Sequence, residues 1–481
     1  MNFVLLKNIF STKNKIIALL LFFILIKGII WAWNIPLFTL SDEVTHFTYI
    51  HYLSEHKELP RKTDTMIKLE KSTVELRKVL KMIKIDKTPL SNAHLNFSNA
   101  TKDRNGSNPI SFNDFLNNSN LRAGWSFNYP PFYYAYASIF YTIGKNLNFD
   151  IIAIAYLIRF SAVIFLIITV VFSYKIAFIF SRDSLFAIII CSIISLMVSV
   201  SAVFSSINND VALIAFGHIV LYLTTRIFYS TRQKIGRLTI FWFLAFIPAI
   251  YSKPQAIIFI PLLIGALIYN GLKNKGLRIN AAINILFIAA AALIAILLLP
   301  SGFLDFFKIN LASINGMNEI TTIVKNDFLR RINLVFDFFV QLGLFHSGHP
   351  IWIFSFLGTL IFLSLVGIIL FFFNFFKNKN NHLEKSRALL LNAAPIIILE
   401  ILYTFLYYRE AIINKVYDFP GQGRYYFIVL APLVIIFVYG LQYVSDYLKL
   451  PRRILYFILI LFFALLNSYF FANIILSAAY L

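Results

Sequence analysis

Apolar runs about as long as a membrane-spanning helix recur along the whole chain and limit the folds open to it. Three of them, at 16–26, 281–299 and 454–466, reach the roughly 20 residues needed to cross a bilayer once their flanks are counted. Of the 481 residues, 59% are hydrophobic and only 14% are charged. The sequence therefore predicts an all-α polytopic membrane protein.

Lysine and arginine gather in the short loops between these runs, and this predicts how the spans are oriented. Cations at 7–15 precede the first run, and the positive-inside rule places such loops in the cytoplasm. This placement also explains the net charge of +21, so no nucleic-acid partner is expected. We expect about eleven spans with the C-terminus outside: 16–35, 152–180, 185–206, 211–228, 238–252, 254–271, 281–300, 351–376, 388–408, 425–446 and 454–476.

The segment 131–145 decides the parity of this topology. It is apolar, but it is short and rich in tyrosine, which favours the membrane interface. We expect a helix lying at the outer surface, and a twelfth span is the alternative. Apolar periodicity also predicts an amphipathic helix at 65–85, and a further helix is expected at 318–344.

These expectations divide the chain into five parts. They are the cytoplasmic N-terminus with the first span (1–35), a first extracytoplasmic loop with acidic and interfacial helices (36–150), a transmembrane module (151–300), a second extracytoplasmic loop (301–350) and the C-terminal spans (351–481). The Lys-, Asn- and Ile-rich usage suggests a bacterial source, so the expected location is the inner membrane.

Under this topology, the ionisable residues at membrane level gather on the outer side, beginning with Asp42, Glu43 and His46. Ser41 and the acidic pair could simply cap a helix and complement its dipole. However, Asp42 and His46 are spaced i,i+4 and share one helical face. A carboxylate held there can act as a general base. The three residues lack the first histidine of a zincin helix, and no metal ligands are predicted.

Two further segments offer cations at the outer side. Lys253 stands before Pro254 between two apolar runs, where it could either snorkel to the interface or hold a phosphate. Arg424 follows Gly421 and Gly423, which allow close approach of the backbone to a ligand. Its guanidinium could bind phosphate oxygens in a bidentate manner. The alternative is an ordinary interfacial anchor.

Lys27 and Glu400 fall well inside their predicted spans. Ionisable groups at that depth are costly to insert and usually face a cavity or a partner. One expectation is that the two side chains pair with each other.

In order along the chain, these elements resemble GT-C glycosyltransferases, the membrane class that includes protein O-mannosyltransferases and the lipid A aminoarabinose transferase. The similar elements are the first span followed by Asp42-Glu43 and His46, the Pro-Pro aromatic stretch from Asn128 to Tyr134, Asn209-Asp210, Ser252-Lys253-Pro254 and Gln422-Gly423-Arg424-Tyr425. The last of them resembles a poorly characterised bacterial branch. In place of the basic residue that often precedes the Pro-Pro pair, this chain has Asn128-Tyr129.

The resemblance implies an inverting sugar transfer on the extracytoplasmic side, from a polyprenyl-phosphate donor to an envelope glycan, lipid or protein. It implies that Asp42, with Glu43 beside it, is the catalytic carboxylate. No cofactor other than the donor is expected, and a divalent cation is left open. The substrate-binding residues expected are His46, Asn128, Tyr133, Asp210, Lys253, Arg330, Arg331, His349, Gln422, Arg424 and Tyr425.

Two other functions compete with this one. A transporter or flippase of lipid-linked glycans would line a path through the membrane with charge, and Lys27 and Glu400 are the central candidates for it. A polymerase of surface polysaccharide would also present outward arginines and large loops.

Overall fold

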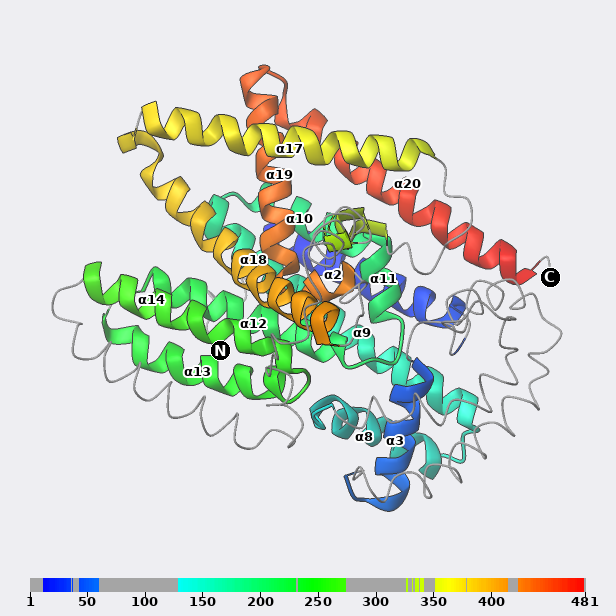
Figure 1. The fold of residues 1–481 in the computed structure, drawn as a ribbon. Coiled ribbons are helices and arrows are strands. Elements are labelled where there is room, and N and C mark those ends of the chain that lie inside the picture. The colour runs from blue at the N-terminus through cyan, green and yellow to red at the C-terminus, as the bar shows by residue number, and fades with distance from the viewer. Residues whose placement is uncertain are drawn as a thin grey trace.

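The computed structural model describes residues 12–35, 37, 43–59, 129–230, 232–273, 326–327, 331, 334–336, 338–340, 351–377, 379–413 and 423–479. The regular secondary structure of these residues is entirely helical (Figure 1). The predicted all-α class is therefore confirmed. The predicted helix at 65–85 lies outside the described residues, and residues 326–327, 331, 334–336 and 338–340 of the one expected at 318–344 are helical.

The helices follow one another along the chain with few long connections inside the described ranges. They are α2 (Thr12–Asn34), α3 (Glu43–His56), α8 (Phe132–Asn146), α9 (Ile151–Ser181), α10 (Ser184–Leu196), α11 (Val198–Phe204), α12 (Asp210–Phe228), α13 (Arg232–Ile250), η2 (Pro254–Ile258), α14 (Phe259–Lys273), α17 (Ile351–Lys377), α18 (Lys379–Ile413), η7 (Gly423–Val429), α19 (Leu430–Tyr447) and α20 (Arg452–Ala479).

Eight of these helical stretches are long and apolar enough to cross a membrane, or nine if the bent pair α10–α11 counts as one crossing. Each of the eight overlaps a predicted span. Of the predicted spans left over, 185–206 is the bent pair, and 281–300 lies outside the described residues. Most of the stretch 238–252 lies in α13. This helix begins with three cations close together, and it is not among the eight. α8 is only 15 residues long and is not among them either.

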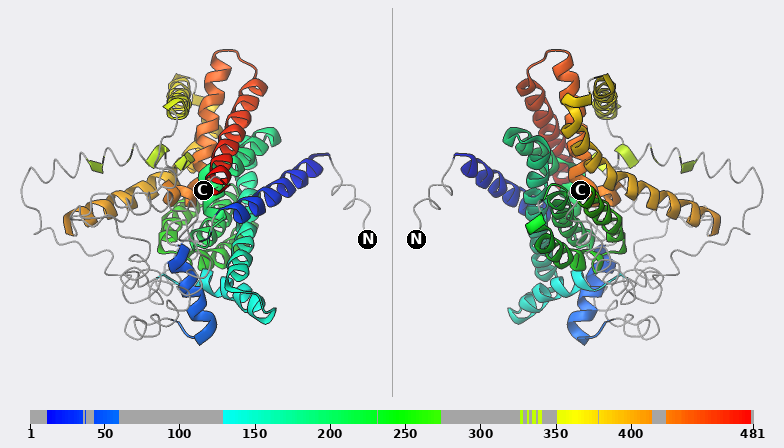
Figure 2. Two further views of the ribbon diagram at one scale, coloured as in Figure 1. Left: turned by 90° about the vertical axis from the view of Figure 1, so that its right-hand side faces the viewer. Right: turned by 90° about the vertical axis from the view of Figure 1, so that its left-hand side faces the viewer.

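α9 is the central helix of the bundle and packs against α2, α8, α10 and α12. Its 31 residues contain no Gly or Pro that would interrupt the helix. Asp150 caps its start by accepting a hydrogen bond from the N–H of Ala153 at 2.7 Å, and Arg182 ends it with φ of 59°. α3 and α8 lie at one end of the molecule, while α17, α19 and α20 lie toward the other (Figures 1 and 2).

The helical run from 184 to 204 bends by 65° at Met197, and Lys27 lies at the break. The break deprives the last carbonyls of α10 of their helical partners. The Lys27 ammonium donates to the carbonyl of Ser195 at 2.7 Å and to the hydroxyl of Ser201 at 2.5 Å. The Asn467 amide donates to the carbonyl of Leu196 at 3.0 Å. Side chains from α2 and α20 thus replace the missing backbone bonds.

The suggested pairing of Lys27 with Glu400 is therefore wrong. Glu400 instead accepts hydrogen bonds from Arg331 at 2.6 Å and from the hydroxyl of Tyr426 at 2.8 Å. An unsatisfied polar group in hydrocarbon is costly. Lys27 and Glu400 therefore each bond to polar groups of neighbouring segments.

Replacing Lys27 by Met should destabilise the fold, because the carbonyl of Ser195 would be left without its donor. The expected loss is about 1–3 kcal/mol, seen as a lower midpoint of thermal unfolding in detergent. Lys15→Met is the matched control, because Lys15 is an exposed lysine of the same helix. Equal midpoints for the two variants would contradict this role of Lys27.

α17 and α19 touch backbone to backbone at Gly367 and Gly440. A Cβ atom at Gly367 would lie 1.9 Å from the carbonyl oxygen of Gly440, and one at Gly440 would lie 2.2 Å from that of Ser364. No side chain fits at either position unless the helices separate. In a bilayer, such close packing of small residues is a principal source of helix association.

We expect Gly440→Ala to lower the thermal unfolding midpoint by forcing α17 and α19 apart. Gly265→Ala, in α14, should leave the midpoint unchanged or raise it slightly, since nothing lies within 4 Å of its Cβ position and Ala favours a helix. The comparison is made on purified protein by following tryptophan fluorescence on heating. A harmless Gly440→Ala substitution would show that the two helices do not meet as described.

Candidate functional site

Asp210, the first residue of α12, lies between two cations in the interior of the protein. The ammonium of Lys253 is 2.6 Å from Oδ1 of Asp210, and Nε of Arg424 is 3.7 Å from Oδ2. The three side chains are only 5–6% exposed. They come from the start of α12, the turn before η2 and the start of η7, so the fold brings together three separate segments. We call these three residues the Asp210 cluster.

Aromatic rings cover the two cations of the cluster. The Lys253 ammonium lies 5.0 Å from the ring centre of Tyr425 and 5.6 Å from that of Tyr129. The Arg424 guanidinium lies 5.8 Å from the Tyr425 ring. Both arrangements are cation–π contacts, which strengthen when water is excluded. The Asp210 cluster is therefore a charged group inside a largely aromatic wall.

His46 of α3 also contacts this aromatic wall. Its ring stacks on Tyr129, with 6.0 Å between ring centres, and its Nδ1 lies 2.8 Å from the hydroxyl of Tyr134. Tyr133 is buried beside Tyr134 in an edge-to-face contact at 5.6 Å. The predicted residues His46 and Tyr133 thus belong to the aromatic layer that links α3 and α8 to the Asp210 cluster.

Backbone contacts hold the turn at 251–253 in place. The N–H of Phe132, at the start of α8, donates to the carbonyl of Tyr251 at 3.0 Å. The side-chain amide of Asn209 donates to the carbonyl of Ser252 at 3.0 Å, whereas its oxygen is buried and has no hydrogen-bond partner within the described part of the chain. Asn209 is the N-cap position of α12, and the side-chain oxygen of Asn208, one residue earlier, accepts from the N–H of Val211 in the first turn at 3.3 Å.

The charges of the cluster stabilise one another. Burial lowers the pKa of Lys253, but the nearby Asp210 carboxylate and the hydroxyls of Tyr129 and Tyr425 together outweigh this and hold the pKa above its ordinary value. Lys253 therefore stays protonated at neutral pH. Although the sequence allowed Lys253 to snorkel to the interface, its side chain is buried and ion-paired.

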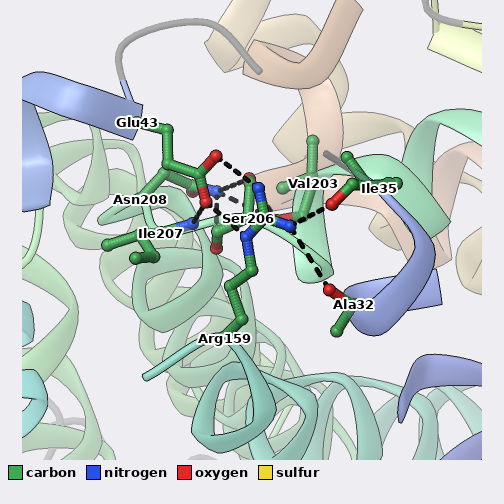
Figure 3. A network of polar contacts seen from close by, with 8 residues as sticks. All are labelled: Ala32, Ile35, Glu43, Arg159, Val203, Ser206, Ile207 and Asn208. Atoms are coloured by element: carbon green, nitrogen blue, oxygen red, sulfur yellow. Dashed lines mark hydrogen bonds and ion pairs between the residues drawn. The ribbon is translucent and has the colours of Figure 1, made fainter. Parts of the chain in front are cut away.

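Glu43, the first residue of α3, forms a fully buried ion pair with Arg159 of α9 (Figure 3). Nε and Nη2 of Arg159 donate to the two carboxylate oxygens at 2.6 Å each. The N–H of Ile207 adds a third bond to Oε1 at 2.9 Å. Arg159 also donates to the carbonyls of Ala32 and Ile35 at the end of α2. Both oxygens of Glu43 are thus engaged in charge-assisted bonds.

Arg331 is joined to the cluster through a second network. It donates to Asp327 at 2.9 Å, to Glu400 at 2.6 Å and to the hydroxyl of Thr404 at 2.7 Å. Glu400 in turn accepts a hydrogen bond from Tyr426. Tyr426 lies in η7, two residues after Arg424 of the Asp210 cluster. The Arg331 side chain is 35% exposed, so this network lies nearer the surface than the Asp210 cluster.

Five of the predicted site residues, Asp42, Asn128, Arg330, His349 and Gln422, lie outside the described residues. Among the remaining ones, Asp210, Lys253, Arg424 and Tyr425 converge, and His46 and Tyr133 adjoin them. Tyr129 and Arg159 were not in the predicted set. An arginine within an apolar run was the signal available for Arg159, because such a group needs a buried partner. Within the described ranges, no group of three His, Cys, Asp or Glu side chains could hold a metal ion.

Comparison with known proteins gives one match. A family model described as "Predicted membrane protein (DUF2142)" matches residues 25–436, a stretch that begins in α2 and ends in α19. It includes the Asp210 cluster and the Glu43–Arg159 pair. No curated protein and no solved structure matches the chain.

Glu43→Gln should be strongly destabilising, because it leaves the buried Arg159 without its countercharge. Loss of one partner of a buried pair costs about 3–5 kcal/mol. The control is Glu55→Gln on the same helix, whose pair with Lys145 is 2.7 Å long but partly exposed and should contribute less than about 1 kcal/mol. Thermal unfolding in nanodiscs measures both. A loss at position 43 no larger than that at position 55 would contradict this difference.

Proposed function

The chain belongs to the DUF2142 family of predicted membrane proteins, and we propose that it is a GT-C-type glycosyltransferase. In this proposal, it moves a sugar from a polyprenyl-phosphate donor to an envelope glycan, lipid or protein, at the extracytoplasmic face of the inner membrane. The observation that carries the proposal is the Asp210 cluster, in which two buried cations meet beside one carboxylate at the starts of three candidate spans.

The position of the cluster suits an anion on a lipid. Three candidate spans begin next to it, at Asp210, Pro254 and Gly423. The N-terminus of an α-helix carries a partial positive charge, so the start of α12 adds to the positive potential of Lys253 and Arg424, while the other two spans begin with the short 3-10 helices η2 and η7. A phosphate at this level could keep its isoprenoid chain in the hydrocarbon, and no soluble nucleotide site would be needed.

The cluster also suits the chemistry of a phosphate leaving group. When the bond between the anomeric carbon and the phosphate oxygen breaks, negative charge grows on that oxygen. Lys253 offers a point charge and Arg424 a planar fork of donors, and both are fixed in advance in a site of low exposure. Charge stabilisation of this preorganised kind is usually the largest contribution to catalysis. Asp210 holds the two cations in place until the donor arrives.

The remaining parts of the reaction fall to α3 and the residue before it. We propose that Asp42 takes the proton from the acceptor hydroxyl or amine while that atom attacks the anomeric carbon from the face opposite the phosphate. The configuration is therefore inverted. Glu43 would act as a positioning residue, since its carboxylate is occupied by Arg159 and Ile207. The stacked rings of His46 and Tyr129 would offer an apolar face to the sugar.

A transporter or flippase of lipid-linked glycans is the second candidate. It is favoured by the broken run α10–α11 with Lys27 at the break, because discontinuous helices often form binding sites in transporters. The two functions differ in their product. A transferase releases free polyprenyl phosphate from the donor, whereas a flippase moves the donor across the bilayer unchanged.

The test uses polyprenyl phosphate, the product that every such donor would release. Arg424→Gln should weaken its binding to the purified protein by about tenfold or more, equivalent to about 1.4 kcal/mol. Arg237→Gln, at an exposed arginine of α13, is the control and should bind normally. Asp42→Asn should bind polyprenyl phosphate normally but release none from a bacterial lipid extract, as measured by mass spectrometry.

Three outcomes would contradict the proposal. If Arg424→Gln and Arg237→Gln bind polyprenyl phosphate equally well, the Asp210 cluster does not bind the phosphate. Full turnover by Asp42→Asn would remove Asp42 as the base. Movement of intact donor between leaflets without release of polyprenyl phosphate would favour the flippase.

A further inference from the structure

Asn209, the residue before Asp210, carries a buried acceptor that no group in the described part of the chain satisfies. The residue is only 1% exposed. Its amide nitrogen donates to the carbonyl of Ser252 at 3.0 Å, but its amide oxygen makes no hydrogen bond within the described ranges. Because an unpaired buried acceptor is costly, such an atom in a folded protein needs a donor from water or from a ligand.

The side chain of Asn209 does not play the role that its position would suggest. Asn209 stands at the N-cap of α12, where an asparagine oxygen commonly accepts a hydrogen bond from the first turn of the helix. It makes no such bond, and the oxygen of Asn208 accepts from the N–H of Val211 instead. Exchanging the oxygen and nitrogen of the Asn209 amide would set an oxygen against the Ser252 carbonyl, so this contact assigns the orientation of the amide. The oxygen of Asn209 is therefore available to an incoming donor.

This oxygen lies in the immediate surroundings of the Asp210 cluster. Asn209 precedes Asp210 in the chain, and its amide bonds to Ser252, which precedes Lys253. Consecutive Cα atoms are about 3.8 Å apart, so Asn209 is next to the backbone that carries two members of the cluster. A ligand whose phosphate binds Lys253 and Arg424 would therefore meet Asn209 with atoms that are a few bonds from the phosphate.

The charge around Asn209 restricts the kind of donor that fits. The Asp210 cluster holds two cations and one carboxylate, so one positive charge is in excess. This excess would repel a protonated amine, and the neutral amide oxygen of Asn209 does not compensate for it. A hydroxyl group is neutral and can donate. The surroundings of Asn209 therefore favour a hydroxyl over an ammonium group.

From these observations we propose that Asn209 is a specificity-determining residue, whose oxygen accepts a hydrogen bond from the hydroxyl next to the anomeric carbon of the donor sugar. This inference rests on the proposed function. The hydroxyl is the sugar donor closest to the phosphate, which would bind Lys253 and Arg424. A sugar without it would leave the Asn209 oxygen buried and unpaired, and sites of this kind reject such analogues. Hydrogen bonds to this hydroxyl also strengthen in the transition states of glycosidic bond cleavage.

The test compares ligands that differ at this one carbon, using the full-length protein in nanodiscs. Polyprenyl phosphoglucose and polyprenyl phosphomannose carry the hydroxyl in opposite configurations, and one deoxy compound is the analogue of both. Polyprenyl phosphoglucosamine carries a protonated amine at the same carbon. Each affinity is expressed relative to that of bare polyprenyl phosphate for the same protein, so a change that acts on phosphate binding alone cancels.

We expect the wild type to bind the better of the two hydroxyl compounds about tenfold more tightly than the deoxy analogue, as the loss of one hydrogen bond predicts. The amine compound should bind no better than the deoxy analogue. Asn209→Ala should abolish the preference for the hydroxyl. Asn392→Ala, at a buried asparagine whose amide donates within its own helix α18 at 2.8 Å, should keep the preference of the wild type.

The outcomes distinguish this inference from the proposed function. If bare polyprenyl phosphate binds in a manner that depends on Arg424, but the wild type binds the deoxy analogue as well as the hydroxyl compounds, the role of Asn209 is overturned and the transferase proposal stands. The same holds if Asn209→Ala keeps the preference. If bare polyprenyl phosphate does not bind, both proposals are overturned. The comparison of ligands on the wild type can contradict the role of Asn209 by itself, whether or not Asn209→Ala folds.

Discussion

The buried pair of Arg159 and Glu43 is the interaction on which the arrangement of the site depends. Arg159 belongs to the central helix, and its guanidinium bonds to α3 and to the carbonyls that end α2. Through Glu43 the same network reaches the N–H of Ile207, three residues before α12 begins. A charge buried this completely is tolerated only when it is paired and hydrogen-bonded. The first turn of α3 therefore cannot move without exposing or orphaning an ion.

This constraint connects the two halves of the candidate site. α3 carries His46 into the aromatic layer, and the turn after α11 leads into Asn208, Asn209 and Asp210. Since both are tied to Arg159, the carboxylate side of the proposed reaction and its cationic side are held in one frame. Rigid positioning of this kind is what effective catalysis or selective binding demands of a site. The partly exposed pair of Glu55 and Lys145 lies further along α3 and joins that helix to the end of α8.

Much of the fold could be predicted from sequence because membrane spans leave a simple signal. Each of the eight apolar helical stretches matches a predicted span, since a run of about 20 apolar residues has few other structures open to it. The bend at Met197 could not be predicted, because the run around it contains neither Gly nor Pro, and its serines are compatible with an unbroken helix. It depends on Lys27 and Asn467, which lie far away in the sequence. Which distant side chains meet the bend is decided by how the helices pack, and the local sequence does not show this.

The sequence allowed us to predict which segments carry site residues, but not which charged side chains pair with each other. The short polar segments around Asp210, Lys253 and Arg424 stand out against apolar surroundings, and the fold does bring them together. The sequence could not show that Glu43 is bound to Arg159, or that Glu400 is bound to Arg331 instead of Lys27. Charge pairing across a helix bundle depends on which faces meet, and helical periodicity alone does not determine this.

The contact between Gly367 and Gly440 has a consequence for any lipid that enters the bundle. Where two helix backbones touch, no acyl or isoprenoid chain can slip between them, so the seam of α17 and α19 is closed to lateral entry. A long-chain ligand with its headgroup at the Asp210 cluster must therefore lay its tail along some other boundary of the protein. Because Gly367 and Gly440 lack side chains, the two helices close together, and this excludes one route by which such a molecule could enter or leave the bundle.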